Sequence, residues 1–372
     1  MRIGVPTEIK VHEYRVGLTP NSVAELVRAG HDVVVQAGAG LGIGCTDDDY
    51  VGAGASILPT AQAVFEDAEM IVKVKEPQPS ETAMLKPHHT LYTYLHLAAD
   101  PAQAQALRDS GCTAIAYETV TDDDGRLPLL TPMSQVAGRM SVSVAAQCLQ
   151  KAEGGRGLML GGVPGVLPAK VVIIGGGVAG THAAEMAIGA RADVTVFDRS
   201  NKRLAELDEQ FAGAVKTAYS TRAALDAAVR EADVVIGAVL IPGAAAPKLV
   251  SRAMLSEMRD GAVLVDIAID QGGCFETSKA TTHDEPTFII DKVVHYCVAN
   301  MPGAYSRTSA FALNNATLPF ALAIANKGTQ RALNDDAHLA RGLNVAEGEI
   351  CYAPVAADLD MPFQKPSWLT SI

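Results

Sequence analysis

The chain has 372 residues, of which 48% are hydrophobic and 19% are charged. This composition excludes a disordered chain, and at about 150 residues per domain the length predicts two or three domains. The formal net charge is −12, and no cluster of Lys and Arg reverses it locally. We therefore expect no nucleic-acid binding, because an acidic surface repels the phosphate backbone.

The spacing of the cysteines and the length of the apolar runs indicate in which cellular compartment the protein occurs. Six cysteines stand singly along the chain, with no CxxC or Cys/His spacing that would hold zinc or iron. In a chain of this size, such a pattern predicts reduced, buried thiols. The N-terminal residues lack the apolar core of a signal peptide, and no run reaches the roughly 18 apolar residues of a membrane span. We expect a cytoplasmic protein without a membrane partner.

Short β-branched runs alternate with Ala- and Leu-rich helical segments in the first third of the chain, which is typical of a parallel-sheet α/β domain. Strands are predicted at residues 2–6, 31–36, 70–75, 90–95 and 113–117. Helices are predicted at 21–29, capped by Thr19 or Asn21, and at 101–110. This series predicts one doubly wound domain.

A second series provides six strands, the number needed for two mononucleotide-binding halves. These strands are predicted at 171–174, 193–197, 215–219, 234–237, 263–269 and 293–298, after a helix at 134–151. Beyond Asn300 the strand signal stops, and 308–326 and 329–340 are predicted to be helical. Because these helices are surplus to a six-stranded sheet, we expect the C-terminal segment to pack back on the first domain.

The predicted fold is therefore α/β, with two doubly wound domains. A Rossmann NAD-binding domain, residues 131–307, is inserted into a discontinuous substrate domain formed by residues 1–130 and 308–372. We expect a cleft between the two.

A glycine motif opens the second series. Gly175-x-Gly177-x-x-Gly180 follows an apolar strand and begins an alanine-rich helix. Gly175 permits the tight turn, Gly177 allows close approach of a pyrophosphate, and Gly180 allows close contact of helix and strand. The helix N-terminus then offers N–H groups to the phosphates. The alternative is a glycine turn without a ligand, but the strand–turn–helix context favours dinucleotide binding.

Asp198 ends the next predicted strand, 18 residues after Gly180. At this offset an acidic residue holds the ribose hydroxyls of the adenosine and repels a 2′-phosphate, which favours NAD over NADP. Arg199, Lys202 and Arg203 follow closely, and such a basic trio could neutralise a 2′-phosphate.

Five polar side chains follow predicted strands, at the edge where ligands bind in open α/β sheets. Arg15 lies in the loop after the first strand, and Lys75 and His96 end two others. In the second series, Asp270 and Asn300 end two strands. Arg and Lys suit a carboxylate and a carbonyl oxygen, whereas His and Asp can exchange protons beside a nicotinamide. The group predicts a small α-amino or α-keto acid as substrate.

Four of these residues also have a structural interpretation. Arg15 and Lys75 would be ordinary charges in a loop and at a strand end. His96 would be a core histidine, and Asp270 would cap a turn. Their shared position at strand ends favours the functional interpretation. Two other enzyme classes are excluded, because the glycine-rich segment 154–165 lacks the Gly-Lys-Ser/Thr ending of a phosphate loop and no Gly-x-Ser-x-Gly elbow is present.

Longer motifs occur nearly from end to end of the chain. They are GVPTEIK at 4–10, EYRVGLTP at 13–20, VKEP at 74–77, YLHLAA at 94–99, PMSQVAGR at 132–139, GGVPG at 161–165, DIAIDQGG at 266–273 and VANMPG at 298–303. Together they resemble the alanine dehydrogenase and pyridine nucleotide transhydrogenase family. The resemblance covers the whole chain, and the combination of motifs is highly specific.

The resemblance implies roles for individual residues. Arg15 and Lys75 match positions that bind the substrate carboxylate and carbonyl, with Asn300 as a further substrate contact. His96 and Asp270 match the catalytic acid/base residues. The positions that match cofactor contacts are Ser134, Val178, Asp198, Arg203, Ser220, Val239, Leu240, Ile267, Ala268, Ile269, Asp270, Lys279, Val298, Ala299, Asn300 and Met301. The glycine turn adds Gly175, Gly177, Ala179 and Gly180 to the predicted cofactor site.

The resemblance also implies an activity. It is the NAD-dependent oxidative deamination of L-alanine to pyruvate and ammonium, with the reverse reductive amination, in an enzyme that is typically a homohexamer. Some members carry a magnesium site from a Glu and a His in a late helix. Here the matching positions are Ala323 and Lys327, so we expect no metal.

Three alternatives stay open at this point. A lysine-forming saccharopine dehydrogenase shares the architecture but takes a larger, dicarboxylic partner. A transhydrogenase-like subunit binds NAD without a small substrate and requires a membrane partner. Such a subunit would not need Arg15, Lys75 and His96 together. The third alternative is a protein that binds NAD without catalysis.

Overall fold

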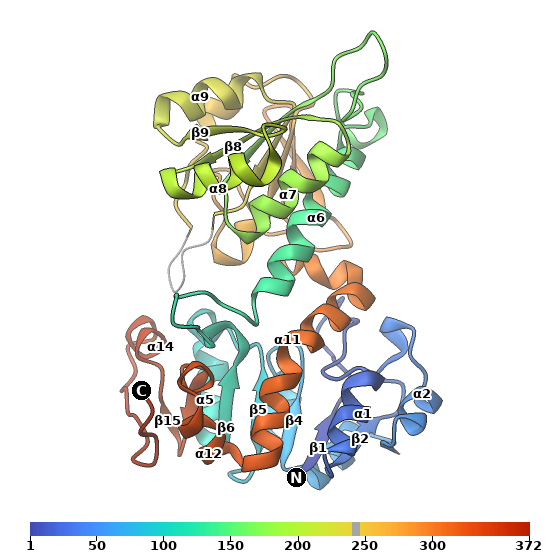
Figure 1. Ribbon diagram of the computed structural model, residues 1–372, viewed down its shortest axis with the longest axis vertical. Helices are drawn as coiled ribbons and strands as arrows, with labels where there is room; N and C mark the ends of the chain where they lie inside the picture. The colour runs from blue at the N-terminus through green and yellow to red at the C-terminus, as the bar shows by residue number, and fades with distance from the viewer. Residues whose placement is uncertain (240–245) are drawn as a thin grey trace. The chain divides into compact units, whose positions relative to one another are not determined.

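The computed structural model describes residues 1–239 and 246–372, which form two compact units (Figure 1). Unit 1 comprises Met1–Met133 and Gly303–Ile372, and unit 2 comprises Ser134–Pro302. Each unit has its own largely parallel sheet, with apolar clusters on both faces. The predicted α/β class with two doubly wound domains is confirmed.

The sheet of unit 1 has the order β15-β14-β6-β5-β4-β1-β2-β3. Its strands are β1 (Arg2–Val5), β2 (Asp32–Gln36), β3 (Ser56–Leu58), β4 (Met70–Val72), β5 (Thr90–Thr93), β6 (Thr113–Ala116), β14 (Leu343–Ala346) and β15 (Glu349–Ile350). The first six are parallel, whereas β14 pairs antiparallel with β6 and β15 antiparallel with β14. The expectation that no strand follows Asn300 is therefore wrong, and the C-terminal segment completes the sheet of unit 1.

Neighbouring side chains of the central strands pack on opposite faces, as the alternation of a strand requires. Leu91 and Tyr92 of β5, for example, belong to different apolar clusters. Both are fully buried, because helices cover the two faces of a parallel sheet. In Figure 1 the long helix α11 (Ser306–Lys327) lies along one of these faces.

The remaining helices of unit 1 are α1 (Pro20–Arg28), α2 (Asp47–Gly52), α3 (Ala61–Asp67), α4 (Pro79–Thr82), α5 (Pro101–Ser110), α12 (Thr329–Asp335), α13 (Ala337–Ala340) and α14 (Ala353–Asp358). Thr19 is the N-cap of α1, since its side chain accepts a hydrogen bond from the Ser22 N–H. The predicted helix 329–340 is interrupted, because Asp336 caps a new helix with its side chain. Asn314 of α11 accepts from the Thr19 N–H at 2.8 Å, so α11 fixes the loop before α1.

The sheet of unit 2 has the order β12-β13-β11-β10-β7-β8-β9. Its strands are β7 (Lys170–Ile174), β8 (Asp193–Asp198), β9 (Lys216–Tyr219), β10 (Val234–Gly237), β11 (Val263–Asp266), β12 (Thr287–Ile290) and β13 (Val293–Tyr296). Six are parallel, and β12, which was not predicted, adds antiparallel to β13. Its helices are α6 (Thr131–Cys148), which begins at the border of unit 1, α7 (Val178–Gly189), α8 (Asn201–Phe211), α9 (Arg222–Glu231) and α10 (Arg252–Leu255).

Two strands of unit 2 end earlier than predicted. The predicted strand 263–269 ends at Asp266, whose side chain accepts from the Ala268 N–H and starts a 3₁₀ helix, Ile267–Gln271. The predicted strand 293–298 ends at Tyr296. Asp270 and Asn300 consequently lie in the connections beyond the strands rather than at their last residues.

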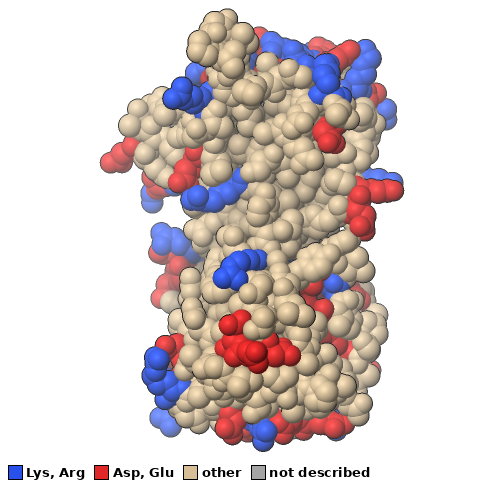
Figure 2. All heavy atoms as spheres, turned by 90° about the vertical axis from the view of Figure 1, so that its right-hand side faces the viewer, with Lys and Arg blue, Asp and Glu red and all other residues tan. Residues whose placement is uncertain are grey.

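The surface charges and the lengths of the helices are relevant to binding of nucleic acid and of membranes. Figure 2 shows Lys and Arg side chains in small groups that alternate with acidic groups on the face it presents. Among the described residues, no helix combines the length and the apolar character needed to cross a bilayer.

Candidate active site

The glycine turn of unit 2 leaves room for a phosphate group close to the backbone. Gly175 has φ 101°, in the region that favours glycine, and a Cβ at Gly180 would lie 1.8 Å from the Gly175 carbonyl oxygen. At Gly177, the N-cap of α7, a Cβ would meet no atom within 4 Å. The turn thus brings α7 tightly against β7 and opens its N-terminus, which fits a pyrophosphate.

Asp198 ends β8 beside this turn. Its Oδ2 accepts from the Gly176 N–H at 2.8 Å, and its Oδ1 accepts from the Ser200 N–H at 2.8 Å. Its carbonyl oxygen accepts from the Ser220 N–H at 2.9 Å, which brings Ser220 to the same edge of the sheet. A carboxylate has about four lone-pair positions, so Asp198 can hold the turn and still accept from ribose hydroxyls.

Arg203 belongs to the turn rather than to an open basic surface. Its Nε donates to the Gly176 carbonyl, its Nη2 to Thr181 and its Nη1 to Glu206, each at 2.7 Å. A guanidinium committed to three protein acceptors is a poor ligand for a 2′-phosphate. This arrangement weakens the proposed role of the basic trio in binding that group.

The connection after β11 carries Asp270 and is held by a buried carboxylate. Asp266 accepts from the N–H groups of Ala268 at 3.0 Å and Cys274 at 2.9 Å, and from the Ser278 hydroxyl. Burial raises the pKa of Asp266 even though these donors lower it. Asp270 Oδ1 lies 3.4 Å from the Asn300 N–H, so the two predicted residues of unit 2 meet.

The other predicted cofactor residues lie on several elements of unit 2. Ser134 is on α6 and Lys279 is exposed on a loop, whereas Val298 and Met301 are buried. Ala299 pairs through its N–H with the Thr281 carbonyl at 3.1 Å. Val239 is partly buried, and Leu240 lies outside the described residues.

Arg15 in unit 1 is buried against a neighbouring carboxylate. Its Nε donates to Glu13 Oε1 at 2.7 Å and its Nη2 to Glu13 Oε2 at 2.5 Å, while Nη1 lies 2.9 Å from the Met133 sulfur. Burial alone would lower the pKa of the guanidinium, but Glu13 raises it above its usual value. One edge of the guanidinium is therefore used to orient it, and Arg15 is not the solvated loop residue of the structural interpretation.

Lys75 lies two residues after Lys73, which belongs to a buried ion network. Lys73 is fully buried between Glu8 at 2.9 Å and Glu81 at 2.7 Å. Burial opposes its charge, but the two carboxylates raise the pKa of its ammonium. Glu8 also accepts from the Val74 N–H at 2.6 Å and the Lys75 N–H at 3.4 Å. The network thus fixes the backbone that presents Lys75.

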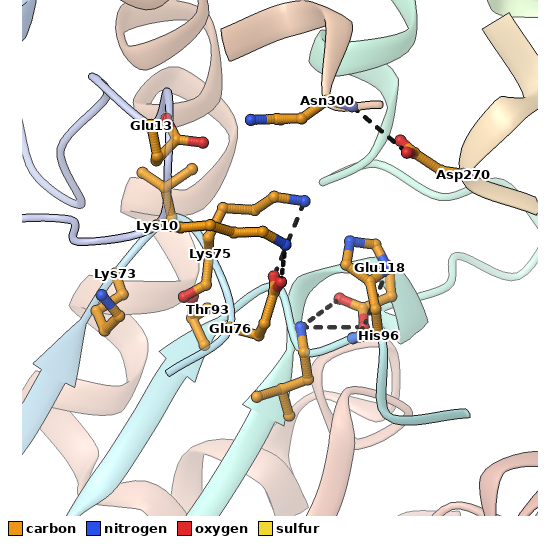
Figure 3. Close-up of polar contacts among 12 residues, drawn as sticks. Lys10, Glu13, Lys73, Lys75, Glu76, Thr93, His96, Glu118, Asp270 and Asn300 are labelled. Atoms are coloured by element: carbon orange, nitrogen blue, oxygen red, sulfur yellow. Dashed lines mark hydrogen bonds and ion pairs between the residues drawn. The ribbon is translucent and has the colours of Figure 1, made fainter. Parts of the chain in front are cut away.

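A second ion pair connects the same loops. Lys10 binds Glu76 Oε1, and Lys75 Nζ lies 3.8 Å from Glu76 Oε2 (Figure 3). Burial opposes the charge of Glu76, but the two lysines lower the pKa of its carboxyl. Glu76 therefore stays ionised between the loop after β1 and the loop after β4.

His96 lies three residues beyond the end of β5. Its backbone is left-handed, with φ 51° and ψ 39°, and its N–H donates to Glu118 Oε1 at 2.6 Å. The imidazole stacks on buried Tyr94 with an interplanar angle of 6°, and 42% of its side chain is exposed. His96 is therefore not a core histidine.

Unit 1 thus brings Arg15, Lys75 and His96 to the carboxyl end of its sheet, and unit 2 brings Asp270 and Asn300 to the carboxyl end of its own. Sequence reasoning missed the carboxylates that hold them, Glu8, Glu13, Glu76, Glu81 and Glu118. A charge within an apolar strand, as at Lys73 in MIVKVK, was the available signal of a buried ion network. Among the residues that the structure describes, no group of three or more His, Cys, Asp or Glu side chains is placed to hold a metal.

Two family models match the chain, one after the other along the sequence. Residues 4–137 match the family "Alanine dehydrogenase/PNT, N-terminal domain", and residues 141–353 match "Alanine dehydrogenase/PNT, C-terminal domain". An alanine dehydrogenase of Halomonas elongata is 60% identical over 96% of both chains. One from Mycobacterium tuberculosis is 52% identical over 99% of both chains.

Two solved structures are similar to this chain over nearly its whole length. A structure titled L-alanine dehydrogenase has a TM-score of 0.94 and 50% identity, and the match covers 97% of this chain and 99% of the other. A transhydrogenase from Sinorhizobium meliloti has a TM-score of 0.80 and 26% identity, over 95% of this chain and 99% of the other. With both family domains matched in order and relatives above 50% identity, the chain belongs to the alanine dehydrogenase/PNT family.

Proposed function

We propose that this chain is an NAD-dependent alanine dehydrogenase. It converts L-alanine, water and NAD⁺ into pyruvate, ammonium, NADH and a proton, and catalyses the reverse reaction. The observation that supports this most directly is that one chain contains both a dinucleotide turn and, in its other unit, an ordered Arg, Lys and His at strand ends. Relatives 52–60% identical that are named alanine dehydrogenases favour the same activity.

In this proposal Arg15 and Lys75 bind the substrate. Glu13 occupies the Nε/Nη2 edge of Arg15, so the guanidinium is held in place before a substrate carboxylate arrives. Lys75 polarises the carbonyl oxygen of pyruvate, because a compact ammonium suits a single oxygen. Asn300 adds an amide that can bind a substrate oxygen.

His96 and Asp270 move protons. Oxidation of alanine requires a neutral amine, water then adds to the iminium carbon, and the carbinolamine expels ammonia. His96 exchanges protons with the hydroxyl or carbonyl oxygen, and Asp270 directs the attacking water. Both tasks need a group that can donate and accept a proton, and the side chains of His and Asp can do both.

The residues of unit 2 fit a dinucleotide. The glycine turn and the start of α7 would hold the pyrophosphate, and Asp198 would hold the adenosine ribose, which favours NAD over NADP. A nicotinamide bound there would supply the acceptor for the hydride that leaves the alanine Cα. The turn after β11 and residues 298–301 would position that ring.

The alternatives are less well supported. The transhydrogenase match is 26% identical, against 50% for the L-alanine dehydrogenase structure. A transhydrogenase-like subunit, which binds NAD without a small substrate, would not need Arg15, Lys75 and His96 held by separate carboxylates. Saccharopine dehydrogenase would need space for a dicarboxylic partner, and the high identity is to enzymes named for alanine.

We also propose a homohexamer in the cytoplasm. The segment 157–167 exposes apolar side chains with relative exposures of 54–84%, and such surfaces are usually covered by partners. They are Met159, Val163, Val166 and Leu167. All six cysteines are unpaired, which suits a reducing compartment. Multi-angle light scattering should measure six chains per particle, and a monomer would contradict the assembly.

The activity is tested by following NADH oxidation with pyruvate, with and without ammonium. Turnover that requires ammonium is the expected result. Turnover without ammonium would instead indicate a 2-hydroxy-acid dehydrogenase, and no turnover would favour a non-enzymatic NAD-binding role. Replacing pyruvate by 2-oxoglutarate with lysine tests the saccharopine alternative in the same assay.

A further inference from the structure

The turn that carries His96 is held by a carboxylate from the short 3₁₀ helix, Tyr117–Thr119, that follows the neighbouring strand β6. Glu118 follows β6, and its Oε1 accepts from the N–H groups of Leu95 at 3.1 Å and His96 at 2.6 Å. Its Oε2 accepts from the Leu95 N–H at 3.2 Å. The Glu118 side chain is only 15% exposed, so both oxygens of a largely buried carboxylate face this turn (Figure 3).

These bonds stabilise a strained backbone. Residues other than glycine seldom adopt the left-handed conformation of His96, and such strain persists where the surroundings determine it. Glu118 binds the two N–H groups on one side of the turn. On the other side, Gln103 Nε2 donates to the Leu95 carbonyl at 3.1 Å. The position of His96 therefore depends on side chains from two other elements.

Glu118 also faces the imidazole ring. Nδ1 of His96 lies 3.9 Å from Glu118 Oε1, and the ring lies parallel to Tyr94 with 5.8 Å between centroids. Tyr94 is itself fixed, since its hydroxyl donates to the Leu129 carbonyl at 2.6 Å. With Nδ1 beside Glu118, the arrangement assigns proton exchange with a substrate to Nε2.

We propose that Glu118 is a positioning residue of the reaction. It fixes His96 in its turn and stabilises the imidazolium that forms when Nε2 takes a proton from the substrate, and it acts through His96 without touching the substrate. This inference rests on the proposed function, in which His96 exchanges protons. The competing explanation is that Glu118 only accepts two backbone hydrogen bonds. A glutamine would then serve almost as well, because its amide oxygen is also an acceptor.

Glu118→Gln separates the two explanations, with Glu349→Gln as the matched control. Glu349 lies in the same unit and pairs with Arg108 at 3.3 Å, away from this turn. We expect Glu118→Gln to lower kcat about tenfold or more, with the KM for pyruvate and the Kd of NADH within about twofold of wild type. Glu118→Asp, which keeps the charge, should recover part of the loss. A kcat for Glu118→Gln within about twofold of wild type, or above that of Glu118→Asp, would overturn the proposal.

A second measurement does not depend on turnover. Diethyl pyrocarbonate modifies neutral imidazole, and mass spectrometry of the peptide that contains His96 reports its rate of modification. The rate should rise several-fold in Glu118→Gln and stay unchanged in Glu349→Gln, because Glu118→Gln removes the negative charge that faces Nδ1 at 3.9 Å. Equal rates in wild type and Glu118→Gln would overturn the proposed pairing.

The two measurements also separate this inference from the proposed function. If wild type shows no ammonium-dependent turnover, the function fails, and the labelling rates still decide whether Glu118 controls His96. If Glu118→Gln does not fold, as shown by circular dichroism, Glu118→Asp takes its place. A carboxylate withdrawn from Nδ1 should then give both a faster modification and a lower kcat than wild type, and wild-type values of both would overturn the proposal.

Discussion

The two units share one strand order and differ in the connection between the first strand and the first helix. Both place their six parallel strands in the order 3-2-1-4-5-6, as β3-β2-β1-β4-β5-β6 and β9-β8-β7-β10-β11-β13. In unit 2, three glycines connect β7 to α7. In unit 1, residues 6–19 connect β1 to α1, and this longer loop carries buried Glu8, Glu13 and Arg15.

The difference shows how one topology is adapted to two kinds of ligand. The order reverses beside the first strand in both units, and ligands bind at such a switch point. Unit 2 presents backbone N–H groups there, which suit the phosphates of any dinucleotide. Unit 1 presents charged side chains held by other charged side chains, which can distinguish one small acid from another. Topology thus sets the place of a site, whereas the loop sets its chemistry.

The largest expected effect tests whether each unit supplies a proton-transfer group. His96→Ala in unit 1 and Asp270→Asn in unit 2 should each lower kcat about a hundredfold or more, because each removes an acid/base group. NADH binding, measured by fluorescence titration, should persist, since the glycine turn and Asp198 are unchanged. Near wild-type kcat in either variant would remove that residue from the mechanism.

A smaller effect is expected from the guanidinium of unit 1. Arg15→Lys keeps the charge but loses the planar donor pair that Glu13 holds, so the KM for pyruvate and for alanine should rise about tenfold. The Kd of NADH should not change. Arg28→Lys is the control, because Arg28 is an exposed residue of α1 that pairs with Glu25. An unchanged KM for pyruvate in Arg15→Lys would mean that Arg15 binds no substrate.

The coenzyme preference should respond to the carboxylate of unit 2. Asp198→Ala should weaken NAD binding several-fold and bring the kcat/KM values for NAD and NADP closer together, because the charge that repels a 2′-phosphate is lost. Asp193→Ala is the matched control, since Asp193 begins the same strand and pairs with Lys216. Equal kcat/KM values for the two coenzymes in wild type would contradict the role of Asp198.

The smallest effect concerns stability, and here the units should behave alike. Each contains a buried histidine, His89 in unit 1 and His295 in unit 2, and burial lowers the pKa of both. The unfolded chain takes up these protons near pH 6.5 and the native chain does not. Above about pH 6.5 these two histidines therefore do not reduce the free energy of unfolding. As the pH decreases through that value, the free energy of unfolding falls.

Differential scanning calorimetry between pH 5 and 8 measures this loss as a decrease in Tm. His295→Gln retains a partner for Thr277 and should make the decrease shallower. An identical pH dependence of Tm in wild type and His295→Gln would show that His295 does not contribute.

The strands differ in how well they could be predicted, depending on how apolar and how long they are and on how far along the chain the paired strand lies. Buried apolar runs were located closely, and β10 and α5 have the predicted bounds. The pair β14 and β15 was missed because Asn344 and a Gly-containing turn interrupt the apolar pattern, and because β14 pairs with β6 more than 200 residues away. The three-residue β3 and the edge strand β12 were too short or too exposed to give a signal.

The candidate site was predictable where polar side chains follow apolar strands. That rule found Arg15, Lys75 and His96, and the structure places each beyond the end of a strand or in the loop after one. Their roles in catalysis stay predictions. The rule could not find Glu13 or Glu118, because these carboxylates act on protein groups rather than on a ligand. Their partners are fixed by packing between strands, which residue spacing along one strand does not contain.

The ion network of unit 1 also limits how this chain can change in evolution. Lys73 lies between Glu8 and Glu81, and all three side chains are nearly inaccessible. Loss of one partner from a buried ion pair costs about 3–5 kcal/mol, so single substitutions at these positions are selected against. A joint replacement by apolar residues would preserve folding but remove the acceptor for the Lys75 backbone. Substitution should therefore be rare at these three buried positions, and homologues that differ at one of them should differ at all three.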